Sequence, residues 1–197
     1  MKLFSEAAER NKEPISEVLA RFIPASGTCL EVSSGSGQHI VYFAKRFSQL
    51  RWQPTEFSQD KNESIQAYIE QSGLQNINDP LQLDVLKEPW PIKEAAMIIN
   101  LNMIHISPKG TCPALFKGGS QILLNEQKLI LYGPFKFKEG HTAPSNLEFE
   151  ARLKETDLDY GLWFMEDLVQ VAIKNDFQLL EKIDMPSNNH CLVFQKI

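Results

Sequence analysis

The sequence predicts an α/β fold with one doubly wound sheet of about seven strands, which is mostly parallel and ends in an antiparallel C-terminal strand. Short apolar, β-prone runs alternate with helical apolar stripes along most of the chain, as parallel sheets with crossover helices require. The last two strand-like runs, 178–184 and 190–195, are joined only by 185–189. So short a link fits a hairpin and not a crossover helix, and it therefore predicts the reversal.

The composition is that of one globular domain, so residues 1–197 are expected to form a single unit. The chain is 43% hydrophobic and 10% aromatic, which is enough for one sizeable core. Its net charge of −5 opposes a broad surface for nucleic acid, and no such partner is expected. The cysteines are widely spaced and form no Cys/His cluster, so neither a disulfide nor a metal site is expected. No apolar run approaches the ~20 residues of a membrane span or resembles a signal peptide, so a cytoplasmic location is expected.

The first elements lead into a glycine-containing turn. Apolar residues recur at helical spacing over 15–22, which predicts a helix with Pro14 in its first turn and a stop at Pro24. The run 28–32 is short, apolar and β-prone, and it leads directly into Ser33-Ser34-Gly35-Ser36-Gly37. A second helical stripe follows over 40–47. The order is therefore strand, turn and helix.

The same alternation continues through the middle of the chain. The run 51–55 predicts a second strand, and 64–71 predicts a helix that Gly73 closes. A third strand is expected over 81–85, followed by the most apolar strand over 95–101.

Two further helices and a fifth strand precede the hairpin. Ser107-Pro108 is expected to cap a helix that extends to residue 124, and 128–132 is the fifth strand. Ser145 and Glu148 have capping-box spacing, so Ser145 is expected to start a helix over 147–153. A helix over 165–174 then leads into the hairpin.

The turn after the first strand is the expected place of ligand contact. In an open parallel sheet, ligands lie beyond the carboxyl ends of the strands. Gly35 and Gly37 lack a Cβ, so they let the backbone approach a ligand closely. Two glycines alone fit a tight turn without a ligand equally well, because short motifs often match by chance.

Three acidic residues near strand ends favour the ligand interpretation. Glu56 follows the second strand, where a carboxylate can accept hydrogen bonds from both hydroxyls of a ribose. Asp84 closes the third strand, where it can accept from an adenine amino group, and Glu31 lies just before the glycine turn. Each acid alone would be ordinary solvated surface, but the three together indicate a nucleoside site.

A nicotinamide dinucleotide would use the same ribose acid, but the turn does not suit it. The dinucleotide fingerprint needs a third small residue for close helix packing, and Ile40 stands at that place. S-adenosylmethionine carries no phosphate and presents a sulfonium and an amino group instead, which suit acidic surroundings. A nicotinamide oxidoreductase is thus the weakest of the interpretations.

The run LEVSSGSGQH resembles motif I of the class I S-adenosylmethionine-dependent methyltransferases, whose fold ends in a reversed hairpin. The segments AAERNKEPI, SGSGQHIVYFAK, WQPTE, NMIHISP, LYGPFK, HTAPSN and MPSNN resemble the methyltransferase-like 26 family over nearly the whole chain. The resemblance implies a Rossmann-like class I methyltransferase fold, with S-adenosyl-L-methionine as the cofactor.

The resemblance also assigns residues to that cofactor. Glu31, Ser33, Gly35 and Gly37 are expected around the methionine moiety, and Glu56 at the ribose. Asp84 and Val85 would border the adenine, and the resemblance adds Asn11 from the N-terminal segment, whose Arg10-Asn11-Lys12 otherwise fits a solvated charge run. The superfamily has a glycine where this chain has Ser33, so we expect the turn to keep its geometry if Ser33 takes a negative φ.

Polar residues after the fourth and fifth strands are the candidates for chemistry at the methyl group. Asn100, Asn102 and His105 lie in an apolar stretch, where an unpaired polar side chain would be costly. Asn100 and Asn102 are therefore expected to bind the cofactor, and His105 is a catalytic candidate. The plain structural interpretation of His105 is a hydrogen-bonded histidine that caps the next helix. Tyr132 and His141 are further catalytic candidates, and His141 belongs to a loop that can act as a lid.

These observations predict a methyltransferase that acts on an unidentified small-molecule or peptide acceptor. Because the sequence shows no unmistakable catalytic dyad, a non-catalytic S-adenosylmethionine-binding module for regulation or partner docking is the alternative. Asn146 is a possible acceptor contact, and Asn188-Asn189 most simply makes the terminal turn.

Overall fold

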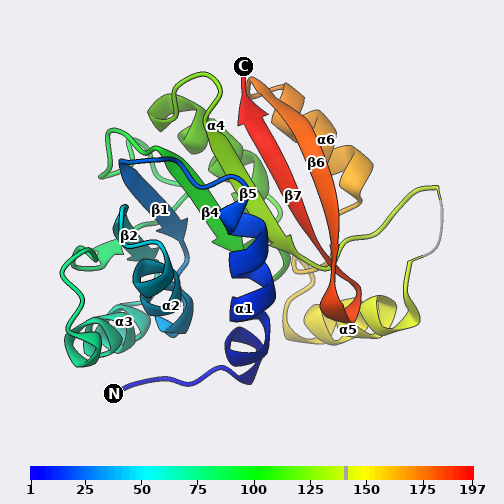
Figure 1. The fold of residues 1–197 in the computed structure, drawn as a ribbon. Coiled ribbons are helices and arrows are strands. Elements are labelled where there is room, and N and C mark those ends of the chain that lie inside the picture. The colour runs from blue at the N-terminus through cyan, green and yellow to red at the C-terminus, as the bar shows by residue number, and fades with distance from the viewer. Residues whose placement is uncertain (140–141) are drawn as a thin grey trace.

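A computed structural model describes residues 1–139 and 142–197, and its centre is a seven-stranded sheet (Figure 1). The strand order is β3-β2-β1-β4-β5-β7-β6. The strands are β1 (Thr28–Val32), β2 (Arg51–Glu56), β3 (Leu81–Gln82), β4 (Met97–Leu101), β5 (Lys128–Gly133), β6 (Phe177–Met185) and β7 (Asn189–Lys196). The helices are α1 (Glu6–Ala20), α2 (Gln38–Arg46), α3 (Gln59–Ser72), α4 (Thr111–Ile122), α5 (Pro144–Thr156) and α6 (Met165–Ile173), with short 3₁₀ turns η1 (Met103–His105) and η2 (Pro186–Asn188).

The pairing of the strands confirms the predicted fold. β1 through β5 pair in parallel, whereas β7 runs antiparallel to both β5 and β6. The chain leaves β1 toward β2 and β3 and later returns to place β4 on the other side of β1. The order therefore reverses between β1 and β4, and this is the point at which open α/β sheets bind ligands.

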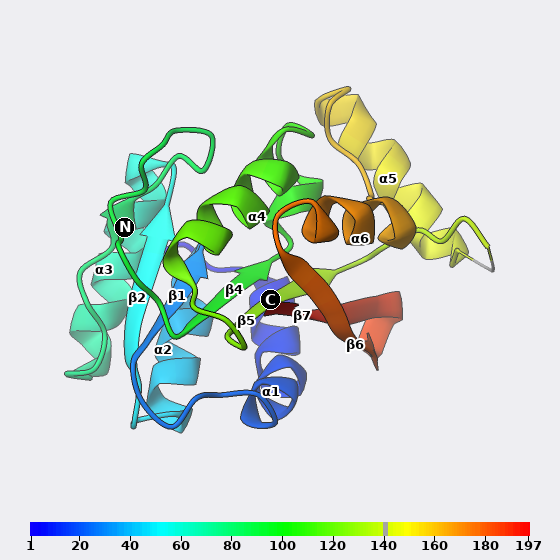
Figure 2. The same ribbon diagram turned by 90° about the horizontal axis from the view of Figure 1, so that it is seen from above.

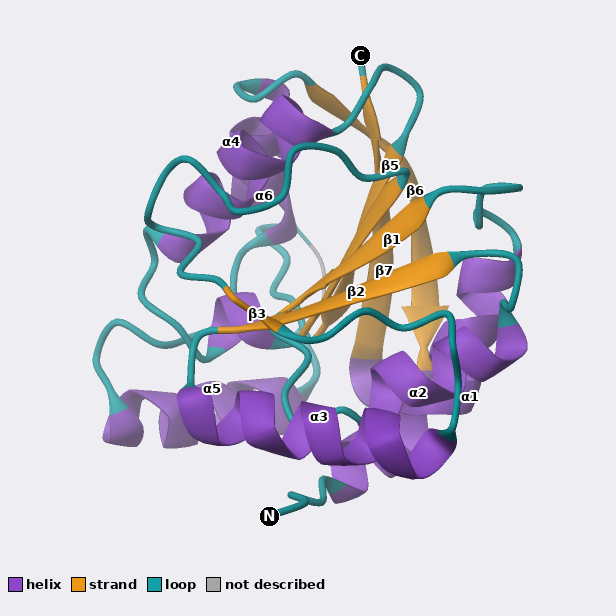
Figure 3. Cartoon of the chain, turned by 90° about the vertical axis from the view of Figure 1, so that its left-hand side faces the viewer, coloured by secondary structure: helices purple, strands orange, loops and turns teal. Residues whose placement is uncertain are grey.

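The helices cover the two faces of the sheet unequally. Helices α1, α2 and α3 lie on one face and α4 and α6 on the other, which is clearest from above and from the side (Figures 2 and 3). Side chains alternate along each strand, so Leu129 and Leu131 pack with α4 and α6, whereas Ile130 and Tyr132 pack under α1 and α2. Two hydrophobic cores result, one on each face.

The first helix begins earlier than the sequence predicts. Helix α1 starts at Glu6 because Ser5 caps it, its hydroxyl accepting from the backbone N–H of Ala8 at 3.2 Å. Pro14 therefore lies inside the helix and not in its first turn. Helix α3 also begins early, at Gln59, but Gly73 closes it as predicted, with φ +67°.

The third strand is shorter than predicted because the chain turns at Asp84. The Asp84 side chain accepts from the backbone N–H of Leu86 at 3.1 Å, and its carbonyl accepts from the N–H of Lys87 at 3.0 Å. This turn ends the pairing with β2 soon after Gln82.

Both predicted serine caps are wrong. The Ser107 hydroxyl donates to the carbonyl of Met103 at 2.8 Å, which closes η1, and α4 starts only at Thr111. Ser145 lies inside α5, which begins at Pro144, a residue that has no N–H to satisfy. The Ser145 hydroxyl accepts instead from the side-chain amide of Asn188 at 3.1 Å.

Candidate functional site

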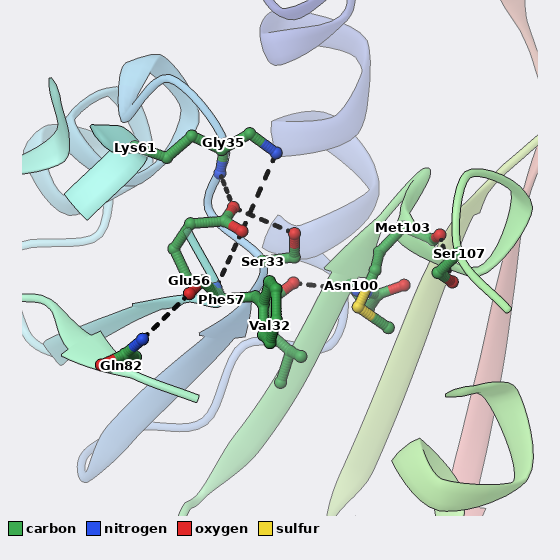
Figure 4. A network of polar contacts seen from close by, with 10 residues as sticks. All are labelled: Val32, Ser33, Gly35, Glu56, Phe57, Lys61, Gln82, Asn100, Met103 and Ser107. Carbon is green, nitrogen blue, oxygen red and sulfur yellow. Dashed lines mark hydrogen bonds and ion pairs between the residues drawn. The ribbon is translucent and has the colours of Figure 1, made fainter. Parts of the chain in front are cut away.

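The turn after β1 contains three residues with positive φ. Ser33 has φ +60°, Gly35 +59° and Gly37 +96°. The negative φ expected for Ser33 is therefore wrong. The residue has a backbone conformation that favours glycine. A compensating contact exists, because the Ser33 hydroxyl donates to Oε2 of Glu56 at 3.0 Å (Figure 4).

The two glycines of the turn serve different purposes. A Cβ on Gly37 would lie 2.8 Å from the backbone Cα of Ile65, so Gly37 allows α3 to pack closely against the start of α2. A Cβ on Gly35 would meet no atom within 4 Å among the residues the structure describes. Gly35 therefore has open space on the side where a Cβ would project.

Glu56 is the centre of a polar network that joins β2 to the turn (Figure 4). Its Oε2 accepts from Ser33 and from the backbone N–H of Gly35, the latter at 2.9 Å. Its Oε1 accepts from the N–H of Phe57 at 2.9 Å and lies 3.8 Å from Nζ of Lys61. The residue is only 3% exposed, so this carboxylate is fixed in one orientation.

Glu31 and Asn100 place two unpaired oxygens beside the turn. Oε2 of Glu31 and Oδ1 of Asn100 are buried without a hydrogen-bond partner among residues 1–139 and 142–197. The Asn100 amide donates to the carbonyl of Val32 at 2.8 Å, which fixes the side chain across β1 and β4. Burial raises the pKa of the Glu31 carboxyl to about 8; a hydrogen bond with Ser34 opposes this rise, and the nearby Glu56 charge contributes to it. Both groups can still accept a hydrogen bond from a ligand.

A cavity of about 370 Å³ opens beside this network at the carboxyl ends of β1 to β4. It brings together four of the predicted cofactor residues, Ser33, Glu56, Asp84 and Val85. Five other predicted cofactor residues are outside its lining: Glu31, Gly35, Gly37, Asn100 and Asn102. The rest of the wall consists of residues that the sequence interpretation did not assign to the site: Val32, Phe57, Lys61, Leu83, Leu86, Met103, Ile106, Ser107, Pro108, Thr111 and Tyr160. Of these, Phe57 and Lys61 could have been found because they follow Glu56 at the start of α3.

His105 lies at the end of η1, on the far side of β4 from the turn. The residue is 1% exposed, and neither ring nitrogen has a hydrogen-bond partner in the described part of the chain. A Cβ on Gly133 would lie 2.5 Å from Nε2 of His105 and 3.3 Å from Oδ1 of Asn102, so Gly133 brings β5 close to both side chains. Burial lowers the pKa of the imidazole to about 3, so the ring is neutral at pH 7.

Asn11 of α1 and Tyr132 of β5 lie on the opposite face of the sheet from α4. Asn11 is inside α1, and its Oδ1 lies 2.7 Å from Nε2 of His39 in α2. Burial raises the pKa of the Tyr132 hydroxyl, and a hydrogen bond with Asn11 opposes the rise. Neither residue reaches the 370 Å³ cavity. His141 lies outside the described residues.

The segment before α1 is tied to the glycine turn. The backbone N–H of Ser5 donates to Oε1 of Gln38 at 2.6 Å, and that of Leu3 donates to the hydroxyl of Ser64 at 2.7 Å. The Ser64 hydroxyl in turn donates to the carbonyl of Ser36 at 2.8 Å. The N-terminal segment therefore supports the turn from outside.

A second cavity, of about 470 Å³, lies at the same edge of the sheet near β5 and the β6–β7 hairpin. The register places His190 of β7 opposite Gly133 of β5. The cavity is lined by an aromatic residue, three asparagines and an ion pair, among other residues: Phe137, Asn146, Asn188, Asn189, Lys182 and Asp184. Two of the segments singled out in the sequence, HTAPSN and MPSNN, thus meet here, although each lies far from the other in the chain.

Two kinds of feature are absent from the part of the chain that the structure describes. It contains no group of three or more His, Cys, Asp or Glu side chains that could hold a metal ion. None of its helices combines the length and apolar character needed to cross a membrane.

A family model described as "Protein of unknown function (DUF938)" matches residues 2–196. The fold is similar to that of the mitomycin 7-O-methyltransferase MmcR, with a TM-score of 0.82 and 11% identity over 97% of this chain and 55% of that one. An O-methyltransferase family 2 protein from Planctomyces limnophilus, solved in complex with apigenin, has a TM-score of 0.78 and 17% identity over 97% and 60%. CalO1, a methyltransferase in calicheamicin biosynthesis solved in its SAH-bound form, has a TM-score of 0.76 and 14% identity over 98% and 56%.

These likenesses establish the class I methyltransferase fold. The chain spans a little over half the length of these three structures, between 55% and 60%.

Proposed function

The chain belongs to the DUF938 family of proteins of unknown function, and we propose that it is an S-adenosylmethionine-dependent methyltransferase with an unidentified small-molecule or peptide acceptor. The observation that carries the proposal is the convergence of Ser33, Glu56, Asp84 and Val85 on one cavity at the reversal point of the sheet. In this proposal residues 1–197 are one S-adenosylmethionine-binding domain, of the subfamily that methyltransferase-like 26 represents.

The described residues fit each part of the methyl donor. Glu56 has acceptor capacity left on Oε1 for ribose hydroxyls, and Asp84 with Val85 borders the adenine. The unpaired oxygens of Glu31 and Asn100 are the proposed acceptors for the amino group of the methionine moiety. A sulfonium and an ammonium group would stabilise the ionised form of Glu31, whose burial otherwise favours the protonated form.

His105 is the proposed catalytic residue on the acceptor side. Bound S-adenosylmethionine supplies an electrophilic methyl group. The protein must then orient the acceptor and take its proton where the acceptor is a hydroxyl or a protonated amine. A pKa of about 3 makes the His105 ring a weak base, so in this proposal its unpaired nitrogen accepts a hydrogen bond from the acceptor and orients it.

The second cavity is the proposed acceptor site. It lies beyond β5, whereas the donor cavity lies beside β1 and β2, so in this proposal the reactive atom of the acceptor extends from the second cavity toward the first. Its volume of about 470 Å³ is in the ~300–1,000 Å³ range of small-molecule pockets. Three asparagines and the face of Phe137 can bind a polar group and an apolar body, respectively.

The test is formation of S-adenosylhomocysteine from S-adenosylmethionine with panels of phenols, amines, carboxylic acids and short peptides. We expect turnover with at least one class. We expect Glu56→Gln to lower kcat/KM for the donor at least tenfold, while Glu63→Gln, an exposed acid in the same region, leaves it unchanged. Binding of S-adenosylhomocysteine without turnover on any panel would contradict the proposed catalysis and leave donor binding intact.

A further inference from the structure

Ser33 occupies a backbone conformation that costs free energy. Its φ of +60° lies in the left-handed region, where a residue with a Cβ is disfavoured and glycine is not. A glycine at this position would fit without strain. The backbone conformation of this serine therefore lowers the stability of the fold. The hydroxyl can offset that loss, because it makes a hydrogen bond that glycine cannot make.

That hydrogen bond goes to the carboxylate expected to hold the ribose. A carboxylate accepts about four hydrogen bonds, two on each oxygen. On Glu56, Oε2 already accepts from Ser33 at 3.0 Å and from the N–H of Gly35 at 2.9 Å, so the turn saturates this oxygen. Oε1 accepts one hydrogen bond, from Phe57, and has Lys61 at 3.8 Å. The free acceptor position is therefore on Oε1.

The other serines of the turn make no hydrogen bond to Glu56. The hydroxyl of Ser34 donates to the carbonyl of Glu31 at 3.4 Å, and that of Ser36 donates to Oε1 of Gln38 at 2.9 Å. Ser33 is thus the side chain of the turn that orients this carboxylate, and both residues line the donor cavity. The close view shows the hydroxyl and the carboxylate facing each other between β1 and β2 (Figure 4).

We propose that Ser33 is a positioning residue that makes the donor site selective for an intact ribose, because it fixes Glu56 with Oε1 free for the sugar. This inference rests on the proposed function. Without the hydroxyl, the carboxylate keeps its charge but loses one of the two contacts that hold Oε2, so it rotates and binds the ribose hydroxyls less well. Groups that bind the adenine and the methionine moiety are unaffected.

The test compares S-adenosylhomocysteine with its 2′-deoxy analogue by calorimetry on the full chain. For the wild type we expect the deoxy analogue to bind about tenfold more weakly, a difference of about 1.4 kcal/mol. The ratio of the dissociation constant of the deoxy analogue to that of S-adenosylhomocysteine falls toward one in Ser33→Ala and Ser33→Gly, because only the affinity for the intact ribose is lost. Ser36→Ala is the matched control and keeps the wild-type ratio.

The two variants separate positioning from stability. Alanine keeps the strain at φ +60° and glycine relieves it, so Ser33→Gly is expected to melt at a higher temperature than Ser33→Ala while showing the same reduced ratio. In a Glu56→Gln background, Ser33→Ala should lower the ratio no further, as expected of two residues acting as one unit.

The possible failures are distinguishable. A wild type that binds S-adenosylhomocysteine but does not discriminate against the deoxy analogue overturns the inference alone, and so does either Ser33 variant that keeps the wild-type ratio. A wild type that does not bind S-adenosylhomocysteine overturns the proposed function as well.

Discussion

Among single residues, Glu31 couples the stability of the protein to its proposed ligand. Its carboxyl is buried and its pKa is raised from 4.5 to about 8. Between these two values the folded chain binds a proton that the unfolded chain has released, so the free energy of unfolding falls as pH rises through this window. The same acid would lower its pKa when a cationic ligand binds.

Glu31→Gln is therefore expected to stabilise the free protein and to lower its affinity for the methyl donor. The difference in melting temperature between variant and wild type should grow from pH 5 to pH 8 and reach several degrees, since 1 kcal/mol corresponds to about 2–4 °C in a chain of this size. Thermal unfolding across this pH range measures it, with Glu63→Gln as an exposed control. A constant difference would show that Glu31 is ionised in the folded chain.

His105 has two interpretations that a single substitution separates. If His105 orients the acceptor, the substitution His105→Gln should lower kcat by roughly 10²-fold, while the dissociation constant of S-adenosylhomocysteine stays within about twofold. Steady-state kinetics and calorimetry give the two numbers. If affinity and kcat fall together with the melting temperature, His105 is only a structural histidine.

Glu56 and Asp84, the acids that line the cavity, were predictable because each lies at or just beyond the end of a strand. The backbone of Ser33 was not, since its positive φ depends on a contact with Glu56, which lies 23 residues away in the chain. Tyr160 contributes to the cavity through the path of its loop, which no local pattern encodes.

On the scale of elements, Gly37 controls how α2 packs on α3. A Cβ there would lie 2.8 Å from the Cα of Ile65, whereas a Cβ on Gly73 at the end of α3 would meet nothing within 4 Å among described residues. Both glycines have positive φ, so alanine is strained at each.

We expect Gly37→Ala to destabilise the fold by clearly more than Gly73→Ala, which costs about 1 kcal/mol through backbone strain alone. Urea unfolding of the two variants gives the comparison, and the excess for Gly37→Ala measures the contact between helices. Equal losses would mean that α3 shifts away without cost.

Errors in the predicted elements occur where side chains override local patterns. Pro14 suggested a helix start, but Ser5 caps α1 a few residues earlier. Ser107 and Ser145 have the spacing of N-caps, yet the hydroxyl of the first closes a 3₁₀ turn and that of the second contacts the hairpin. Capping signals in a sequence show which hydroxyls can form a hydrogen bond, but not the group with which each one forms it.

For the whole molecule, alternating strands and helices and a short final link were enough to predict the sheet. Short apolar, β-prone runs indicated the strands, and the length of the last link indicated the reversal of β7. The strand order was not predictable in this way, because crossover helices can place each new strand on either side of the previous one. The order determines that β1 and β4 are neighbours, and it therefore determines where the cavity lies.

The most direct test of the central claim is calorimetric titration of the full chain with S-adenosylhomocysteine and, separately, with NAD⁺. We predict that one molecule of S-adenosylhomocysteine binds per chain, that Glu56→Gln weakens this binding at least tenfold, and that NAD⁺ gives no binding heat. Binding of NAD⁺ without binding of S-adenosylhomocysteine would contradict the account.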